Sequence, residues 1–272
     1  MNSTLKIAAI QMISTPDVQE NLNDASHLVS AAAKDGAQVI VLPEYFCLMG
    51  MKDTDKVVIK EILGAGPIQS RLANIAKENA VYLVAGSIPL VADDPNKVLN
   101  TTLVFNPDGM CIAQYDKIHL FGFATDQERY EESATISPGN KPGIFTIQID
   151  GNDWCFGLSI CYDLRFPELY RAMGQVDCHI IPAAFTYTTG KDHWEILLRA
   201  RAIENQCYLL ASAQGGRHEN QRRTWGHSML IDPWGTVLSD LPDGPGFISG
   251  ILSKVKLNEV RSKLPALKHR QL

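Results

Sequence analysis

The chain has 272 residues, of which 45% are hydrophobic and 20% are charged, so it is long enough to bury a sizeable core. A net charge of -5 and the lack of any block of lysine and arginine argue against a nucleic-acid groove or an anionic membrane surface as the partner. No apolar run is long enough to cross a bilayer, and the opening MNSTLKIAAIQM lacks the features of a signal peptide, so we expect a cytoplasmic protein.

Apolar runs of strand length alternate with helical patterns in the first half of the chain. LKIAAIQM is predicted to be a strand, and a helix with one apolar face follows it from Asp17. Next come a strand at AQVIVLPEY, a helix around GPIQSRLANIAKENA and a strand at VYLVAGSIPL. Asp-Gly turns between apolar runs then predict two hairpins, LVFNPDGMCIA and TIQIDGNDWCFGLSI.

The second half of the chain continues this alternation. A short helix is predicted from Pro167 and the last helix from Lys254. Between them the sequence predicts, in chain order, the strand DCHIIPAAF, the helix DHWEILLRARAIENQ, the strand CYLLASA, the hairpin HSMLIDPWGTVLSD and the strand GFISGIL.

This order of elements is typical of an α/β fold in which helices cover a mixed sheet or a pair of sheets. Two of the hairpins, FNPDGMCI and IDPWGTVL, are similar and lie about half a chain apart. They indicate an internal pseudo-repeat, although a shared turn chemistry would give the same similarity. No low-complexity linker divides the chain, so we expect one domain over residues 1–272.

The cysteines and histidines give no sign of a metal site. The six cysteines are scattered without a C-x-x-C pair, which argues against a disulfide framework or a zinc site. Most of them stand in apolar runs (MCIAQ, DWCFGL, DCHIIPAAF, QCYLLASA) and are expected in the core. The seven histidines show no ligand spacing, so we expect no bound metal.

Three of the predicted strands are followed by a reactive side chain. VIVLPEYF ends in Glu44, CIAQYDKIHLF carries Lys117 near its end, and CFGLSICYD ends in Cys161. Taken singly, each has an ordinary explanation as a solvated acid, a surface lysine or a small core residue. Together they supply a thiol, a carboxylate that can take its proton, and a cation for an oxyanion. In open α/β sheets such chemistry lies beyond the carboxyl ends of the strands.

The motifs LPEYF, YDKIHLF and SICYDLRFPELYR resemble, in this order, the Glu–Lys–Cys signature of the nitrilase superfamily of carbon–nitrogen hydrolases. The resemblance covers nearly the whole chain. It implies an α-β-β-α sandwich, hydrolysis of a non-peptide carbon–nitrogen bond through a thioester on cysteine, no cofactor, and a homodimer. It also implies that Glu44 is the general base and acid, Lys117 the oxyanion donor and Cys161 the nucleophile. The backbone N–H of Tyr162 would be the second oxyanion donor.

A fourth site residue follows from the same resemblance. RYEESATISPG is similar to the family segment that carries a second glutamate, which here falls on Glu132. Its implied role is to orient Lys117 and the substrate or to share in the proton transfers. The alternative is that Glu132 is one of several acids in a solvated surface loop.

The stretch QGGRHENQRRTWGHSM resembles the superfamily branch that contains deaminated-glutathione amidase and omega-amidase, and the former more closely. The implied substrate is a small anionic amide, deaminated glutathione, with 2-oxoglutaramate or another small amide or carbamoyl compound as the alternative. Its carboxylates call for an arginine clamp, for which Arg217 is the candidate together with Arg222 and Arg223. Phe185 and Thr186 are expected to line the pocket, unless they belong to the core.

Two other readings remain open at this point. A Cys–His hydrolase would use His193 or His227 as the base, but it would leave Glu44 and Lys117 without a role. A non-catalytic protein on the same fold would have no need to keep all three reactive groups.

Overall fold

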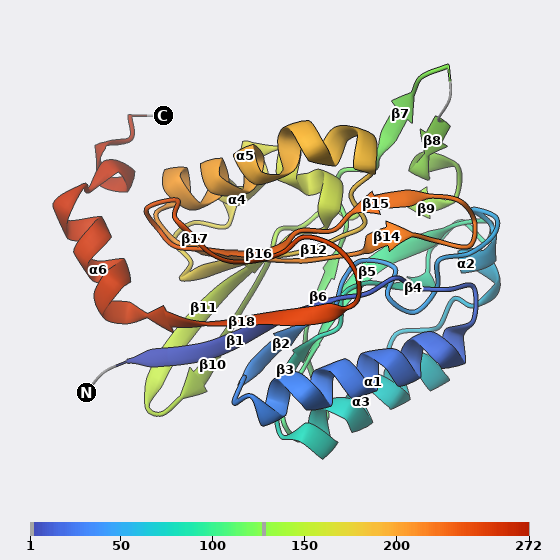
Figure 1. Cartoon of the computed structure of the whole chain (residues 1–272), viewed down its shortest axis with the longest axis horizontal. Coiled ribbons are helices and arrows are strands. Elements are labelled where there is room, and N and C mark those ends of the chain that lie inside the picture. Colours follow the sequence, from blue (N-terminus) through green and yellow to red (C-terminus); the bar gives the residue numbers. More distant parts are fainter. Residues whose placement is uncertain (1–2, 127–128, 272) are drawn as a thin grey trace.

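The computed structural model describes residues 3–126 and 129–271, in which two β-sheets lie face to face with helices on their outer sides (Figure 1). The helices α1 (Val18–Lys34) and α3 (Pro67–Asn79) cover the first sheet. The helices α4 (Pro167–Ala172) and α5 (Tyr187–Asn205) lie on the outer side of the second sheet. The predicted α-β-β-α sandwich is therefore confirmed. The remaining helices are α2 (Asp55–Val58), α6 (Lys254–Lys263) and the 3₁₀ turns η1 (Glu132–Ala134), η2 (Cys161–Arg165) and η3 (Ala266–His269).

The two sheets repeat one strand order. The first sheet contains β1 (Thr4–Gln11), β2 (Val39–Val41), β3 (Tyr82–Val84), β4 (Ile88–Val91), β5 (Val98–Phe105), β6 (Cys111–Asp116), β9 (Ile136–Ser137) and β18 (Gly246–Ser253). The second contains β10 (Gly143–Ile149), β11 (Asn152–Leu158), β12 (Cys178–Ala183), β13 (Tyr208–Ala213), β16 (Ser228–Ile231) and β17 (Val237–Leu241). In both, three parallel strands are flanked by one antiparallel strand on one side and an antiparallel hairpin on the other. The two similar hairpins of the sequence occupy equivalent places, in agreement with a pseudo-repeat.

Alternation along β1 shows how the layers are held together. Ile7 and Ala9 belong to the core between the two sheets, whereas Ala8 and Ile10 pack in the core under α1 and α3. Successive side chains of a strand point to opposite faces, so a strand buried on both faces must be apolar at every position. α1 begins where it was predicted, because the Asp17 carboxylate accepts a hydrogen bond from the backbone N–H of Glu20 at 2.9 Å.

Three local predictions were wrong. The run VYLVAGSIPL forms two strands rather than one, because Gly86 turns the chain with φ +50° directly against the carbonyl oxygen of Pro43. α5 begins at Tyr187, earlier than the predicted DHWEILL pattern. Cys111 was expected in the core, but it lies exposed on β6.

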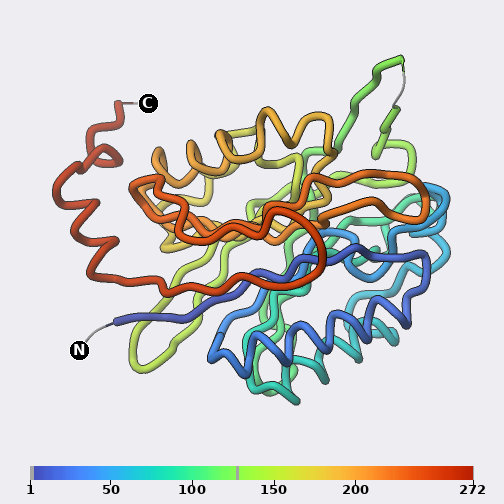
Figure 2. Tube along the Cα trace, in the orientation of Figure 1, coloured from blue at the N-terminus to red at the C-terminus, as the bar shows by residue number. Residues whose placement is uncertain are grey.

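Two small hairpins were not predicted. The hairpin of β7 (Gly122–Ala124) and β8 (Arg129–Glu131) projects from the body of the molecule, as the trace in Figure 2 shows. The hairpin of β14 (Gly215–Arg217) and β15 (Arg223–Trp225) lies near the ends of the central strands. Both are too short and too polar to give an alternating apolar pattern.

His179 on β12 is fully buried, and neither of its ring nitrogens has a hydrogen-bond partner within the described residues. Burial lowers the pKa of His179 from 6.5 to about 3. The folded state therefore keeps the ring neutral while the unfolded chain takes up a proton, so stability is lost as the pH falls from 6.5 towards 3.

We expect His179→Leu to resist acid unfolding better than the wild type, by about 2 kcal/mol at pH 5 relative to pH 7.5. Urea unfolding at the two pH values measures the difference. The control is His27→Leu, at an exposed position on α1. An equal pH dependence in the wild type and His179→Leu would contradict the expectation.

Candidate active site

The three reactive side chains at the strand ends meet between the two sheets. Glu44 follows β2 and Lys117 follows β6 in the first sheet, and Cys161 follows β11 in the second. The Lys117 ammonium lies 2.8 Å from Oε1 of Glu44. The charges of both residues act on the Cys161 thiol. The structure thus brings together the residues that the sequence placed at separate strand ends.

Cys161 stands at a strained turn. Its φ of +49° is unfavourable for a residue with a side chain, and it places the sulfur where β11 gives way to η2. Asp163 fixes this turn by accepting hydrogen bonds from the backbone N–H of Ile160 at 2.9 Å and from the Tyr115 hydroxyl at 2.7 Å. The thiol itself is buried, with 7% of the residue exposed.

The Cys161 thiol is neutral in the resting site. Burial raises its pKa well above the ordinary value, and the Glu44 carboxylate raises it further, while Lys117 acts in the opposite direction. A thiol in this state would need a base before it could act as a nucleophile at neutral pH. Glu44 is the carboxylate that acts on it most strongly.

Glu44 is held by three donors from three parts of the chain. Oε1 accepts from Lys117 Nζ at 2.8 Å and from Asn100 Nδ2 at 3.0 Å. Oε2 accepts from the backbone N–H of Ala184 at 2.9 Å, which joins the end of β2 to the end of β12 across the sandwich. Asn100 and Ala184 were not predicted, because nothing near them in the sequence marks them as partners of a residue so far along the chain.

Lys117 is fully buried between two carboxylates. Its Nζ donates to Oε1 and Oε2 of Glu132 at 2.9 and 2.8 Å as well as to Glu44. Burial favours the neutral amine, but the charges of Glu132 and Glu44 outweigh it and raise the pKa of Lys117. A lysine has three donors, and all three are engaged here.

Glu132 belongs to this network and not to a solvated loop. Besides Lys117, it accepts from the Tyr45 hydroxyl at 2.8 Å and from the backbone N–H of Phe121 at 2.7 Å. Burial alone would raise the pKa of Glu132, but the Lys117 ammonium and these hydrogen bonds lower it, so the residue is an anion. Tyr45 was not predicted, although it directly follows Glu44 and has a φ of +55°.

Tyr162, Phe185 and Thr186, which the sequence placed at the substrate, line one small cavity together with Cys161. Arg165, which was not predicted, lies over the rings of Tyr162 and Phe185 at 5.8 and 5.3 Å. It stands in the same SICYDLRFPELYR motif as the nucleophile, and that position was the available signal.

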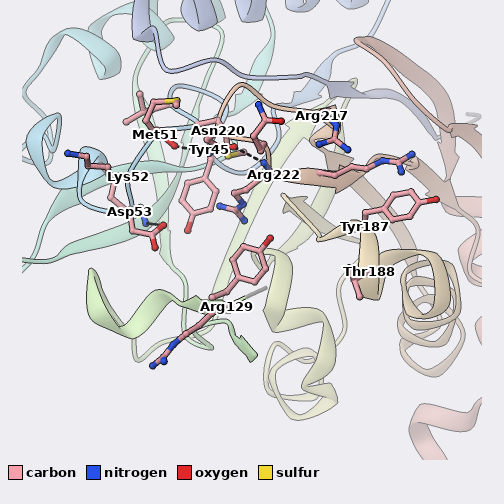
Figure 3. Close-up of a pocket in the computed structure, with 17 residues that line it drawn as sticks. Tyr45, Met51, Lys52, Asp53, Arg129, Tyr187, Thr188, Arg217, Asn220 and Arg222 are labelled. Atoms are coloured by element: carbon pink, nitrogen blue, oxygen red, sulfur yellow. Dashed lines mark hydrogen bonds and ion pairs between the residues drawn. The ribbon is translucent and has the colours of Figure 1, made fainter. Parts of the chain in front are cut away.

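A larger cleft of about 710 Å³ opens on the Tyr45 side of the network (Figure 3). Arg217 lies exposed at this cleft rather than in the small cavity around Cys161. Among the described residues, six cations line the cleft, and Asp53 is the one acid beside them. The cations are Lys52, Lys56, Arg129, Arg217, Arg222 and Arg223. In a chain of net charge -5, this concentration of positive charge makes the cleft suited to binding an anion.

The two histidines of the alternative mechanism lie elsewhere. His193 is exposed on α5, where its ring faces the Arg165 guanidinium at 3.3 Å. His227 pairs with Asp240 at 3.0 Å. Neither is among the groups that act most strongly on the Cys161 thiol. The placement gives a Cys–His pair no support.

Among residues 3–126 and 129–271, no three His, Cys, Asp or Glu side chains are grouped so that they could hold a metal ion. Within the same ranges, no helix has the length and apolarity needed to cross a membrane.

Comparison with known proteins agrees with this geometry. Residues 6–262 match the family model of carbon–nitrogen hydrolases. A deaminated glutathione amidase from Synechocystis sp. is 42% identical over 268 residues, which cover 97% of each chain. The omega-amidase NIT2 of Xenopus tropicalis is 36% identical, covering 98% of this chain and 95% of its own. The crystal structure of Saccharomyces cerevisiae Nit3, a member of the nitrilase superfamily, matches with a TM-score of 0.85 at 30% identity over 99% of this chain and 97% of its own.

Proposed function

The chain belongs to the carbon–nitrogen hydrolase family, and on that premise we propose that it hydrolyses a small anionic amide through a thioester on Cys161. The observation that carries the proposal is the buried Glu44–Lys117 pair beside a neutral thiol at a strained turn. A base, a cation and a nucleophile held together out of water are what acyl transfer from an amide requires.

The first step forms a tetrahedral adduct on Cys161. Glu44 takes the proton of Cys161 as the sulfur attacks the amide carbon, and the carbonyl oxygen becomes an oxyanion. Once Glu44 is protonated, its Oε1 is a weaker acceptor, which releases one N–H of Lys117 from the contact that measures 2.8 Å at rest. That N–H then points its positive charge at the oxyanion. The backbone N–H of Tyr162 is the second donor, because it lies in the first turn of η2, where no partner within the turn is available.

The next steps break the carbon–nitrogen bond, which leaves a thioester on Cys161, and then hydrolyse that thioester. As the oxyanion collapses, the amine leaves with the proton held by Glu44, which returns to the carboxylate form. Glu44 next takes a proton from water, and the resulting hydroxide attacks the thioester carbon. The same two donors hold the second oxyanion, and the thiolate leaves with the proton from Glu44, so the site returns to its starting state. Glu132 keeps Lys117 charged and in place throughout.

The proposed substrate is deaminated glutathione, which carries a carboxylate at each end. Two observations support it: the 42% identical relative bears that name, and six cations line the cleft beside the network. Phe185 and Thr186 contact the substrate near the reacting carbon, and Arg217 contributes charge at the mouth of the cleft. The second candidate is 2-oxoglutaramate, and the 36% identical relative named omega-amidase supports it.

A substrate panel tests this function. We expect kcat/KM to be highest for deaminated glutathione, lower for 2-oxoglutaramate, and lowest for uncharged amides and N-carbamoyl compounds. Arg217→Ala should raise KM more than it lowers kcat, because charge pairing at a distance from the reacting carbon contributes equally to ground-state and transition-state binding. A preference for neutral amides would overturn the substrate, and equal rates for the first two would favour the omega-amidase activity.

We also propose that the enzyme is a cytoplasmic homodimer. All six cysteines are free, which suits a reducing compartment. Ile196 and Ile203 on α5 are 69% and 50% exposed, and Trp234 in the neighbouring β16–β17 turn is 58% exposed; a symmetric partner could cover these apolar side chains.

Light scattering at micromolar concentration is expected to give twice the chain mass. Ile196→Glu should shift the protein towards the monomer, whereas Met110→Glu, at an exposed site on the β5–β6 turn, should leave the mass unchanged. A monomeric wild type would contradict the dimer.

A further inference from the structure

The cations of the cleft differ in how their charge is balanced. Arg129 is paired with Glu131 at 3.1 Å and is largely exposed. Arg223 is exposed too, and it stacks on the Tyr187 ring at 3.6 Å. Lys56 and Arg222 lie deeper, and their charge has little compensation.

Lys56 on α2 has only 15% of its side chain exposed. Its Nζ lies 3.3 Å from the Thr135 hydroxyl and 4.0 Å from the nearest carboxylate oxygen, on Asp53. Asp53 is itself 75% exposed, so water screens its charge. Burial lowers the pKa of Lys56, and the Asp53 and Glu132 charges oppose the shift without cancelling it. A largely buried ammonium whose closest counter-ion among the described residues is screened by water costs free energy, which a bound anion would recover.

Arg222 reaches the same place from the β14–β15 hairpin. Its guanidinium lies 5.0 Å from the Tyr130 ring and has no ion-pair partner within the described ranges. Its charge acts on both Lys56 and Tyr45, so the two cations are close enough to repel each other. Figure 3 shows the Arg222 side chain directed towards Tyr45.

This pair of cations adjoins the reaction centre. The Lys56 ammonium lies 5.5 Å from the Tyr45 ring, and the Tyr45 hydroxyl donates to Glu132, which in turn holds Lys117. One aromatic side chain therefore separates Lys56 from the carboxylate that holds Lys117. The cleft also adjoins the cavity at Cys161 along the chain, since Thr186 lines the cavity and the next two residues, Tyr187 and Thr188, line the cleft.

We infer that Lys56 and Arg222 together bind one carboxylate of the substrate and so determine the specificity of the amidase. This inference rests on the proposed function. It places the carboxylate site at these two deeper cations, while Arg217 is proposed to add charge at the rim. Arg222 supplies a planar pair of donors and Lys56 a point charge, which suits a single carboxylate held from two sides. The carboxylate belongs either to the acyl end or to the amine end of the substrate.

The test compares deaminated glutathione with its two monomethyl esters, each of which removes one carboxylate charge. In Lys56→Gln and Arg222→Gln, kcat/KM for the dianion is expected to fall about 10- to 100-fold, mainly through KM. For one of the two esters the loss should nearly disappear, and that ester identifies the carboxylate. Lys56→Arg should restore part of the discrimination. The controls are Lys60→Gln, further along the same segment with its ammonium on the Pro95 carbonyl, and Arg199→Gln, paired with Glu195 on α5.

A uniform loss on all three substrates, or no loss on any, would overturn the inference. Binding separates it from the amidase proposal. Calorimetric titration of Cys161→Ala with deaminated glutathione should show the same weakening when Lys56→Gln is added, even if the wild type cleaves none of these compounds. Binding that is unaffected by Lys56→Gln would count against the subsite whatever the activity.

Discussion

Replacing Cys161 with alanine is expected to reduce amide hydrolysis by several orders of magnitude, on the order of 10⁶-fold, while the protein remains folded. The variant removes the atom that would form the thioester, and no other thiol is placed beside Glu44 and Lys117. Alanine should leave the turn in place, because the Asp163 hydrogen bonds that fix it do not involve the sulfur. Steady-state turnover measures the loss, and circular dichroism checks the fold.

The thioester itself can be observed. Acid quench of the wild type during turnover, followed by mass spectrometry, should find the acyl group on the peptide that contains Cys161. Cys178→Ala is the matched control, since Cys178 is also buried but lies within β12. Substantial turnover by Cys161→Ala, or an acyl adduct on another cysteine, would contradict the mechanism.

Lys117→Met is expected to weaken both activity and stability. Loss of one oxyanion donor typically costs about 10²–10³-fold in rate. The variant also leaves Glu44 and Glu132 buried without their common cation, which should cost roughly 3–5 kcal/mol of unfolding free energy. Chemical denaturation and kcat measure the two effects separately.

The stability loss of Lys117→Met should depend on pH. In the wild type the pKa of Glu132 is lowered below 4.5, so this carboxyl stabilises the fold above pH 4.5 and stops doing so as the pH falls through its folded pKa. Without Lys117, burial raises that pKa, so the folded variant holds protons that the unfolded chain releases. Its deficit should therefore be larger at pH 8 than at pH 5. Adding Glu132→Gln should recover stability but not activity, and full stability of Lys117→Met at pH 8 would contradict the account.

Local sequence patterns were enough to predict the order of the main elements. The alternating and 3.6-residue patterns come from burial, and most elements of this sandwich are buried on at least one face. Predictions failed where a long-range contact decided the structure. Gly86 divides a continuous apolar run because the backbone at Pro43 passes against it, and this contact joins separate strands. Cys111 lies outside because β6 is exposed along most of its length.

The catalytic candidates could be identified because each stands in its own motif at a strand end. Their partners could not be. Asn100 donates to Glu44 only once β2 and β5 lie in one sheet, and the N–H of Ala184 does so only when the two sheets pack. Lys56 is one of many lysines in the sequence. What distinguishes it is its burial beside a solvent-exposed carboxylate 4.0 Å away, and both are properties of the fold.

The exposure of Cys111 has a practical consequence for chemical probes. A general alkylating reagent reacts according to access and thiolate content. Burial raises the pKa of both Cys161 and Cys111, so access separates them: Cys161 is buried, whereas Cys111 is exposed. Labelling of the wild type with iodoacetamide would therefore modify Cys111 first and report nothing about the active site. Activity-based profiling needs a Cys111→Ser background. If Glu44 is the base, a selective covalent inhibitor has to be bound beside Cys161 before it reacts, because the buried thiol is neutral at rest.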